Sequence, residues 1–371
     1  MFDYSAQIEA FRDERVRLST PFKQKLYDHR DANRDRLISR LPGRIEGLTI
    51  SRYSFKPQGS MAVDTVVQTK FVYEEYDIDD GLILRRSELK AEDGNELTAE
   101  EVRDHVLKSL KDRRFVKQPK QVPNAVRVFY KETDEERHHV DFPVYRKFDD
   151  DCGNTIRELA SADGWSESDP TQVNRWFNNE IESRNKSSSG KGTQMRQLIQ
   201  LLKRFCRSRD NWDLPNGMKL TMLVAECQPP YSDRIDVAFR ELLENLKNRL
   251  SWDKSIRNLA HPDKPLLTRG FSDSNVIELG ERIDEALEKI RELDHEENNN
   301  RNSARKAWDW VFRSDGFFRE YDDSQKEKEK AQRLQVKAAL LESGNARTTA
   351  AGVIGTNGVA NLPHRFYGDH E

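Results

Sequence analysis

The residues of this chain whose types and spacing predict chemistry are three aspartates and one glycine-serine turn. Asp77 and Asp79 stand two positions apart in the segment YDIDDG, and Asp141 stands alone in the segment VDFPV. Side chains two apart on a strand share one face, so Asp77 and Asp79 are expected to project together. The turn QGS at 58–60 can bring backbone N–H groups to a phosphate. The sequence therefore predicts a two-metal site for nucleotidyl transfer from a nucleoside triphosphate.

Each member of this set has an expected role. Asp77 and Asp79 are predicted metal ligands, and Asp141 is expected to complete the metal nearer the attacking hydroxyl and to accept its proton. Gly59 lets the backbone approach the phosphates, and Ser60 offers both an N–H group and a hydroxyl. Mg²⁺ binds through one or two carboxylates plus substrate phosphates, so two Mg²⁺ ions are the expected cofactor, with Mn²⁺ as the alternative.

Chance recurrence of the pattern has to be weighed against this interpretation. The chain carries 65 acidic residues, and Asp-x-Asp recurs at Asp149 and Asp151. That second pair lies in an acidic run, which is typical of a solvated loop. The strand context, the upstream turn and the third acid distinguish the pair at Asp77 and Asp79.

Two further signals are rejected as sites. The segment GKGT at 190–193 lacks the glycine ahead of the Gly-Lys pair, and Gly192 separates the lysine from the threonine, so it is no P-loop. His138 and His139 are neighbours on an expected strand and point to opposite faces, so they cannot converge with Asp141 on zinc. His139 shares the face of Asp141 and is expected near the metals, with nothing in the sequence to make it a ligand.

In order along the chain, these motifs resemble the bacterial cGAS/DncV-like nucleotidyltransferases, which make cyclic oligonucleotides in anti-phage defence. The resemblance is strongest to their cyclic GMP-AMP synthase branch, and it implies that Gln58, Gly59 and Ser60 bind substrate. It extends from about residue 50 to about residue 315 through weaker matches in the same order: SDP at 168–170, WFN at 176–178, RF at 204–205, WD at 212–213, KPL at 264–266 and the segment 304–312.

The resemblance implies an α+β fold with a polymerase-β-like catalytic lobe, a helical lobe and the active site in the cleft. We expect the catalytic lobe with N-terminal support helices at 1–160, the helical lobe at 161–343 and a flexible tail at 344–371. The implied activity joins nucleoside triphosphates, ATP and GTP above all, into a cyclic di- or trinucleotide such as cGAMP with release of pyrophosphate. A separate effector of the anti-phage system, known as CBASS, would respond to the product, and the tail could dock a regulatory protein.

The resemblance also implies a lysine of the helical lobe on the donor triphosphate, assisted by a hydroxyl from the next helix. Lys203 matches this position best, with Arg207 as competitor and Thr221 as the partner. Trp165, Trp176 and Trp212 are candidates to stack on a base, although such residues more commonly belong to the core.

Two alternative functions stay open on the sequence. The same three acids would serve a synthase of linear oligonucleotides or an enzyme that tails RNA, which requires a wider basic groove. The chain could also be a nucleotide-binding sensor without catalysis, which the intact set of acids disfavours. A net charge of −3 offers no global attraction for nucleic acid, so a nucleic-acid partner is not expected.

Length and composition fit a two-lobed enzyme, and the chain is expected in the cytoplasm. Its 371 residues exceed the usual range of one domain, with 35% hydrophobic and 34% charged residues. The three cysteines match no disulfide framework or metal spacing. The N-terminus lacks the basic start and apolar stretch of a signal peptide. No apolar run approaches 18 residues, so no membrane span is predicted.

Hydrophobic periodicity predicts the elements that must position these residues. Strands are expected at 48–55, 76–84, 125–130 and 138–145, the last two as a hairpin around a charged turn at 131–136. Helices are expected over 6–18, 22–41 and 102–110, and then over 170–182, 194–207, 220–226, 235–249, 276–293 and 303–312. The charge run at 322–335 predicts a solvated helix, and the composition from 344 onward predicts disorder.

Overall fold

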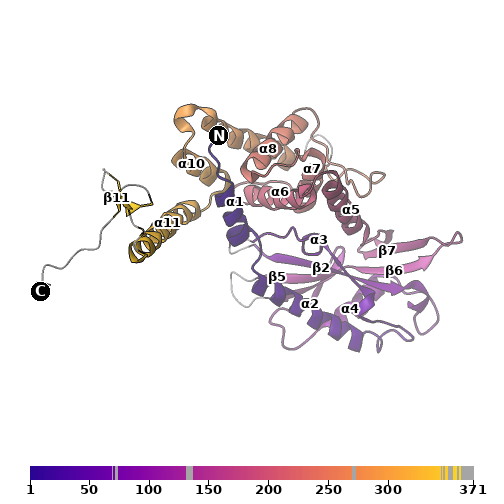
Figure 1. The fold of residues 1–371 in the computed structure, drawn as a ribbon. Coiled ribbons are helices and arrows are strands. Elements are labelled where there is room, and N and C mark those ends of the chain that lie inside the picture. Colours follow the sequence, from indigo (N-terminus) through magenta and orange to yellow (C-terminus); the bar gives the residue numbers. More distant parts are fainter. Residues whose placement is uncertain are drawn as a thin grey trace, which may run out of the picture. The chain divides into compact units, whose positions relative to one another are not determined.

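The computed structural model describes residues 1–68, 70–71, 74–130, 137–269, 273–343, 345, 347–349, 354–356 and 359–360. Contacts divide the chain into two compact units, Met1–Arg313 and Ser314–Glu371, and each is described by itself. The first unit contains a sheet with helices on either side of it (Figure 1). The charged turn predicted at 131–136 and most of the tail beyond 344, including 361–371, lie outside the described residues.

The sheet of the first unit carries the catalytic candidates on its central strands. Its strands run in the order β3-β4-β5-β2-β6-β7-β8, and β1 also pairs with β2. β2 is parallel to β5 and to β6, whereas the other pairs are antiparallel, so the sheet is mixed. The bounds are β1 Phe55–Gln58, β2 Tyr76–Arg85, β3 Lys120–Val122, β4 Ala125–Tyr130, β5 His138–Phe142, β6 Val144–Asp149, β7 Thr155–Ser161 and β8 Gly164–Glu167.

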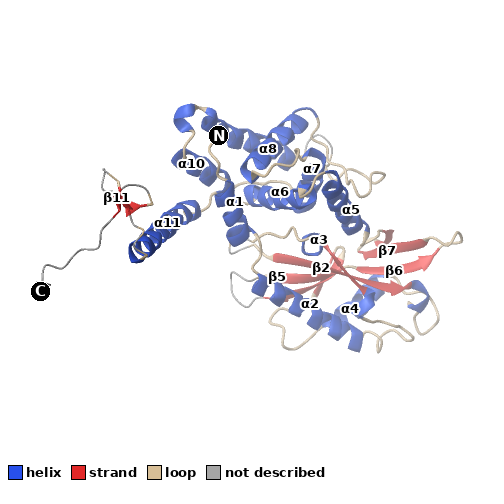
Figure 2. Cartoon of the chain, in the orientation of Figure 1, coloured by secondary structure: helices blue, strands red, loops and turns tan. Residues whose placement is uncertain are grey.

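Helices α2 (Thr20–Arg40) and α4 (Ala99–Leu110) cover one face of the sheet (Figure 2). Ser19 caps α2 ahead of Pro21, and Thr98 with Glu101 forms a capping box at α4. The core beneath them is aliphatic, and each fully buried side chain of this kind contributes roughly 1.5–3 kcal/mol. It includes Leu26, Leu37, Ile78, Leu82, Leu84, Val102, Val106, Val128 and Val140. Burying this face of β2 turns Asp77 and Asp79 to the opposite one.

Asp80, one residue beyond this pair, points into the covered face and is completely buried. Arg34 of α2 donates Nε and Nη2 to its two carboxylate oxygens, each at 2.6 Å. Removing one partner of a buried ion pair leaves an uncompensated charge and costs about 3–5 kcal/mol. We therefore expect Arg34→Met to lower the free energy of unfolding by about that amount, measured by urea denaturation.

The matched control is Arg52→Met. Arg52 lies 2.5 Å from Asp35, but both side chains are about half exposed, at 48% and 61%. An exposed pair contributes at most about 1 kcal/mol, so this change should be nearly silent. Equal losses in the two variants would contradict the role assigned to the buried pair.

Several expected elements are corrected by the structure. The strand predicted at 138–145 is two strands, because Pro143 has no N–H to continue the ladder; its carbonyl instead accepts from Leu82 N at 2.8 Å. The strand predicted at 48–55 is wrong: Arg52–Ser54 is a 3₁₀ turn, and β1 begins only at Phe55. β7 and β8 were not predicted, since charged residues interrupt their apolar pattern.

The N-terminal helix is shorter than expected and packs elsewhere. The segment predicted as one helix at 6–18 consists of α1 (Ser5–Phe11) and a π-helical turn at Arg12–Val16. α1 lies against α8 (Ile235–Trp252), where Asp236 accepts from Tyr4 N at 3.0 Å and from Ser5 Oγ at 2.7 Å. The structure therefore places α2, the second N-terminal helix, against strands β2 and β5 of the sheet, where it also packs on α4.

The second half of the first unit is helical, as predicted. Its helices are α5 Gln172–Ser187, α6 Lys191–Cys206, α7 Gly217–Cys227, α8, α9 Ser274–Arg291 and α10 Arg301–Phe312. α5 and α6 approach closely at Gly192, where a Cβ would lie 2.2 Å from the Ile181 carbonyl oxygen. Trp308 stacks on Phe312 next to Phe239 in the core between α8 and α10. α5 and α6 face β1 and α3 (Gly59–Ala62): Asn174 of α5 donates Nδ2 to Pro57 O at 2.7 Å, and Arg196 of α6 donates Nε to Val63 O, directly after α3, at 3.0 Å.

The second unit consists of α11 (Phe317–Glu342) and a small sheet in the order β10-β9-β11. α11 contains the charge run at 322–335, where most side chains are exposed. The small strands are β9 Arg347–Thr348, β10 Ile354–Gly355 and β11 Val359–Ala360, which are described parts of the segment predicted to be disordered. None of the helices that the structure describes combines the length and apolar character needed to cross a membrane.

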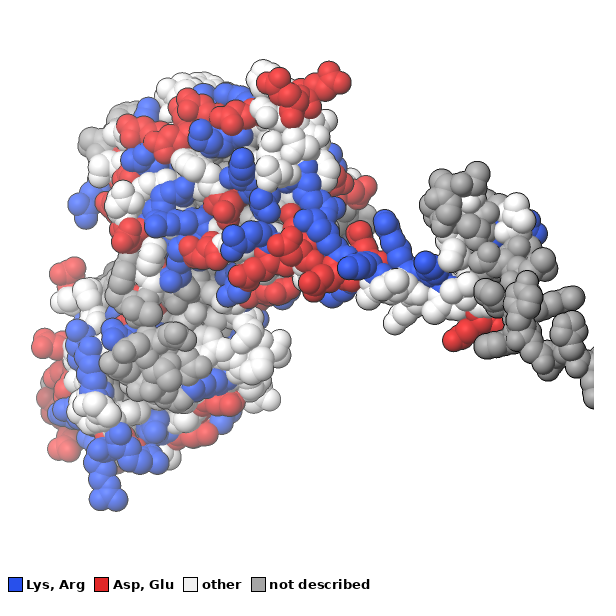
Figure 3. Space-filling view, turned by 90° about the vertical axis from the view of Figure 1, so that its left-hand side faces the viewer, with Lys and Arg blue, Asp and Glu red and all other residues white. Residues whose placement is uncertain are grey.

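Charges of both signs intermix over the face of the first unit shown in Figure 3. Lysine and arginine side chains lie next to aspartate and glutamate side chains there rather than gathering into one basic field. On this face the intermixed charges match the small net charge of −3, and the absence of a nucleic-acid partner stays a prediction.

Candidate active site

A cavity of about 700 Å³ lies between the sheet and the helical half of the first unit. The sheet side contributes Gln58, Gly59, Ser60, Asp77 and Asp79, and the helical side contributes Lys203 and Thr221. The structure thus brings seven of the eight predicted site residues to one cavity. The eighth, Asp141, lies opposite Asp79 in the adjacent strand β5.

Strand register places the three aspartates together. β2 and β5 run parallel with Asp77 opposite His139 and Asp79 opposite Asp141. Because side chains alternate along each strand, all four project from the same face of the sheet. One ligand atom each from Asp77, His139 and Asp141 lie within 4.8 Å of one another, which is a grouping able to hold a metal ion.

The electrostatics of this face fit a bound cation. Burial, followed by the negative charges of Asp77 and Asp141, raises the pKa of Asp79 to about 7. Arg127 of β4 donates Nε and Nη2 to the two oxygens of Asp141 at 2.8 and 2.7 Å. One arginine cannot balance three clustered carboxylates, so a divalent ion among them would lower the repulsion that burial intensifies.

Gly59 occupies a position that only glycine fits. Its φ is +66°, a conformation that side chains disfavour, and a Cβ there would lie 2.3 Å from Asp79 Oδ2. Gly81 also leaves no room for a side chain, since a Cβ there would lie 2.1 Å from Gln58 Nε2. The turn therefore packs directly on the carboxylate strand and holds Ser60 at the cavity wall.

Lys203 connects the helical half to the loop after the turn. It is 4% exposed, and its Nζ donates to Thr65 O at 2.9 Å and to Thr65 Oγ1 at 3.1 Å. Burial, assisted by the positive charge of Arg207, lowers the pKa of Lys203 to about 7. The Thr221 hydroxyl also lines the cavity but donates to Gly217 O at 2.8 Å.

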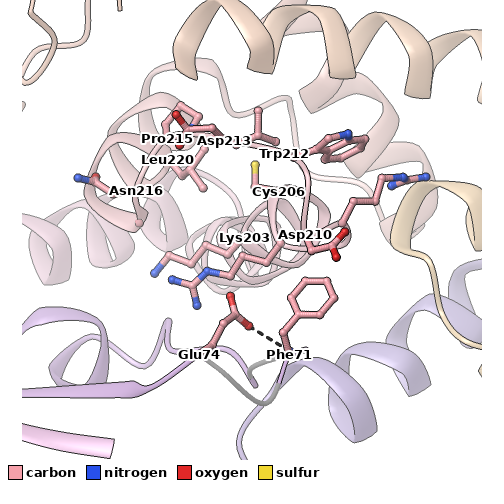
Figure 4. A pocket seen from close by; sticks show the side chains of 14 residues that line it. Phe71, Glu74, Lys203, Cys206, Asp210, Trp212, Asp213, Pro215, Asn216 and Leu220 are labelled. Atoms are coloured by element: carbon pink, nitrogen blue, oxygen red, sulfur yellow. Dashed lines mark hydrogen bonds between the residues drawn. The ribbon is translucent and has the colours of Figure 1, made fainter. Parts of the chain in front are cut away.

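A second cavity of about 280 Å³ lies on the other side of Lys203 (Figure 4). Glu74 and Phe71 form its floor, and Trp212 and Asn216 line it from the helical side. Among the described residues, none of Trp165, Trp176 and Trp212 lines the larger cavity, whose aromatic side chains are Tyr145 and Phe177. The structure therefore does not bring the three tryptophans to the carboxylates.

Sequence reasoning missed two charged neighbours of the carboxylates. Arg127 reaches Asp141 because β4 pairs with β5 in the register that sets these residues opposite each other. Glu75 reaches His139 Nδ1 at 3.2 Å. The predicted hairpin indicated that 125–130 would lie beside 138–145. It did not specify the register of the two strands, and that register decides that Arg127 is the residue opposite Asp141.

Comparison with known proteins agrees with this geometry. Residues 53–145 match the family model described as the nucleotidyltransferase domain of cyclic GMP-AMP synthase DncV-like proteins. The fold is similar to that of the Vibrio cholerae DncV cyclic AMP-GMP synthase, with a TM-score of 0.65 and 16% identity over 84% of this chain and 96% of that one.

Two further solved structures share this fold. One is the Vibrio cholerae enzyme in complex with the linear intermediate 5′ pppA(3′,5′)pG, with a TM-score of 0.64, 16% identity and coverage of 84% and 96% of the two chains. The other is Escherichia coli DncV in its 3′-deoxy GTP bound form, with a TM-score of 0.59, 17% identity and coverage of 80% and 92%. Together with the family match, they establish the α+β fold with a helical lobe.

Proposed function

We propose that this chain, whose residues 53–145 match the DncV-like nucleotidyltransferase domain, joins ATP and GTP into a cyclic dinucleotide of the cGAMP type with release of pyrophosphate. The observation that carries the proposal is the convergence of Asp77, Asp79 and Asp141 on one face below a cavity of about 700 Å³. Cavities of this size hold nucleotide-sized ligands. The structures of similar enzymes with GTP or a linear dinucleotide support the choice of substrate.

The residues present fit the divalent ions that such chemistry uses. Asp77, Asp79 and Asp141 would hold them, since clustered carboxylate oxygens are the ligands that Mg²⁺ and Mn²⁺ prefer. When bound, these ions would stabilise charge on both the attacking and the leaving oxygen. Arg127 fixes the orientation of Asp141. In that orientation we expect the Asp141 carboxylate to accept the proton of the attacking ribose hydroxyl.

The remaining residues would position the donor triphosphate. Gly59 permits close approach of the chain to the phosphates, and Ser60 offers its N–H and hydroxyl from the cavity wall. Lys203 would exchange its hydrogen bonds to Thr65 for a phosphate oxygen. Thr221 would assist from α7 by releasing its bond to Gly217.

The lowered pKa of Lys203 predicts that nucleotide binding takes up a proton. A depressed pKa of about 7 leaves this amine largely neutral at about pH 8, and a bound triphosphate would raise that pKa again. Nucleotide binding at about pH 8 should therefore take up close to one proton, and affinity should fall as the pH rises through 7. Calorimetry in buffers of different ionisation enthalpy measures this uptake.

Lys203→Met should abolish most of the proton uptake. The matched control is Lys264→Met, because Lys264 lines the same cavity but is exposed and donates to Glu167 O at 3.1 Å. The control should retain the uptake of the unaltered protein. Equal uptake in both variants would show that the titrating group is not Lys203.

The substrate pair can be tested by measuring pyrophosphate release with single nucleotides and with all pairs. The proposal predicts that ATP and GTP together release pyrophosphate faster than the sum of the two alone. Equal release with any single nucleotide would instead favour a homogeneous product or the linear synthase. No release with any mixture, while nucleotide still binds, would favour the sensor.

The wider biological role rests on the family likeness. We propose that the product signals to a separate effector in the CBASS type of anti-phage defence, and that a regulatory protein docks on the segment after 344. We also place the enzyme in the cytoplasm, which the three free cysteines support. The division into 1–160, 161–343 and 344–371 stays a prediction.

A further inference from the structure

His139 lies inside the carboxylate cluster, yet the proposed reaction assigns it no role. It stands opposite Asp77 in the parallel pair of β2 and β5 and two residues before Asp141 on the same face. Its side chain is 9% exposed, and Nε2 lies 3.0 Å from Asp77 Oδ1. This nitrogen therefore points at the space that the predicted metal ligands surround.

The Nε2 atom of His139 is buried without a hydrogen bond to the described part of the chain. Its close neighbour is Asp77 Oδ1, at 3.0 Å, a carboxylate oxygen that attracts either a proton or a cation at this nitrogen. A buried polar atom left in this state is costly, and nearly all such atoms in folded proteins have a partner. A cation between Nε2 and the carboxylates would satisfy the nitrogen and both acids at once.

The other ring nitrogen completes a pattern typical of metal-binding histidines. Nδ1 lies 3.2 Å from Glu75 Oε2, so an Nδ1–H would donate to that carboxylate. Histidines that bind metals nearly always donate their second ring N–H to a carboxylate or a carbonyl, which leaves the lone pair of the first nitrogen for the ion. Glu75 thus supports the tautomer of His139 that can act as a ligand.

We propose that His139 is a nitrogen ligand, through Nε2, of the divalent cation held by Asp77 and Asp141, and that Glu75 fixes its orientation. This inference rests on the proposed metal-dependent function. Mg²⁺ strongly prefers oxygen ligands, whereas imidazole suits first-row transition ions. The mixed nitrogen and oxygen site consequently favours Mn²⁺ over Mg²⁺, relative to a site built from carboxylates alone.

The competing interpretation makes His139 a charged bridge between Asp77 and Glu75. A doubly protonated ring would then donate to both carboxylates and occupy the space of the metal. Burial lowers the pKa of His139, but the contact with Asp77 and the charge of Asp141 outweigh burial and raise that pKa. The bridge is therefore the expected state of the metal-free chain, and a bound cation would displace its proton from Nε2. The two interpretations also differ in what a spectrum of bound Mn²⁺ would contain.

The direct test is electron paramagnetic resonance of the full chain with Mn²⁺ and no nucleotide. We expect bound Mn²⁺ to show pulsed-resonance modulation from a directly coordinated ¹⁴N nucleus. His139→Gln should remove this modulation, weaken Mn²⁺ binding by about 10-fold to 100-fold, and leave Mg²⁺ binding much less affected. His261→Gln is the matched control, because His261 lines the same cavity; it should leave the nitrogen signal unchanged.

The outcomes separate this inference from the proposed function. Bound Mn²⁺ that depends on Asp77, as shown by its loss in Asp77→Asn, but lacks a ¹⁴N signal would overturn the inference alone. A nitrogen signal that persists in His139→Gln would also overturn it. Failure of Mn²⁺ to bind at any Asp77-dependent site would contradict the metal site itself. If a variant folds poorly, the presence or absence of the ¹⁴N signal in the spectrum of the unaltered protein still tests whether a nitrogen ligand binds Mn²⁺.

Discussion

Replacing Asp77 or Asp79 with asparagine is expected to lower turnover by at least about 10³-fold, since each carboxylate is a proposed ligand of ions that would contribute several kcal/mol of charge stabilisation. Asparagine has nearly the same shape, so the fold should persist. Removing one of the three clustered charges also relieves the repulsion that raises the pKa of Asp79 to about 7. The variants should therefore unfold at or above the temperature of the unaltered protein while losing activity.

Pyrophosphate release in the presence of Mg²⁺ or Mn²⁺ measures this loss. Asp151→Asn serves as the control, because Asp151 belongs to the exposed acidic run that repeats the Asp-x-Asp pattern without the site. Its activity should stay within about twofold, as for surface substitutions in general. Comparable activity in the Asp77, Asp79 and Asp151 variants would place the catalytic acids elsewhere.

Gly59→Ala is expected to reduce turnover by about 100-fold, the loss that a misplacement of about 1 Å at a reacting centre can cause. The added Cβ would lie 2.3 Å from Asp79 Oδ2, so either the turn or the carboxylate must move. Both movements would separate the turn proposed to bind phosphate from the proposed metal ligands. The measurement is turnover at saturating nucleotide, together with thermal unfolding.

Gly47→Ala provides a control for the backbone alone. Gly47 has a φ of +74°, close to the +66° of Gly59, but no atom lies within 4 Å of a Cβ there. Its substitution imposes similar conformational strain without a contact to the site. Stability should fall similarly in both variants, and activity should fall only in Gly59→Ala. A parallel loss of activity in the two would mean that strain, and not the position of Asp79, is responsible.

The carboxylate face of the sheet could be predicted because it depends on local alternation. Ile78, Leu82 and Val140 bury one face of β2 and β5, and that pattern alone turns Asp77 and Asp79 to the other. The helical half was also accessible, since its helices keep a clear 3.6-residue period. Both predictions rest on residues that are near one another in the chain.

The parts that escaped prediction depend on partners far apart in the sequence. The bidentate contact of Arg127 with Asp141 requires the register of β4 and β5. The buried carboxylate of Asp80 is neutralised by Arg34, which lies 46 positions earlier in the chain. Likewise, α1 docks on α8 through Asp236, and no local pattern identifies that residue as its partner. Tertiary pairing, not local preference, decides these positions.

For Lys203, the family resemblance predicted where the residue lies but not its hydrogen bonds or its pKa. The likeness pointed to Lys203, and the structure places this residue in the wall of the larger cavity, while its role toward the substrate stays a prediction. Its hydrogen bonds to Thr65 and its depressed pKa follow from the packing of α6 on the loop after the turn, which the sequence does not reveal. The contact of Thr65 with Lys203 was likewise not predicted.

The most direct measurement for the account is mass spectrometry of what the purified protein makes from all four nucleoside triphosphates. Reactions contain Mg²⁺ or Mn²⁺ and are treated with phosphatase, and the Asp77→Asn/Asp79→Asn double variant is run in parallel. The account predicts a phosphatase-resistant product at the mass of a cyclic dinucleotide of one AMP and one GMP unit, absent from the double variant. A product that survives in the double variant, or only linear oligonucleotides that the phosphatase trims, would contradict it.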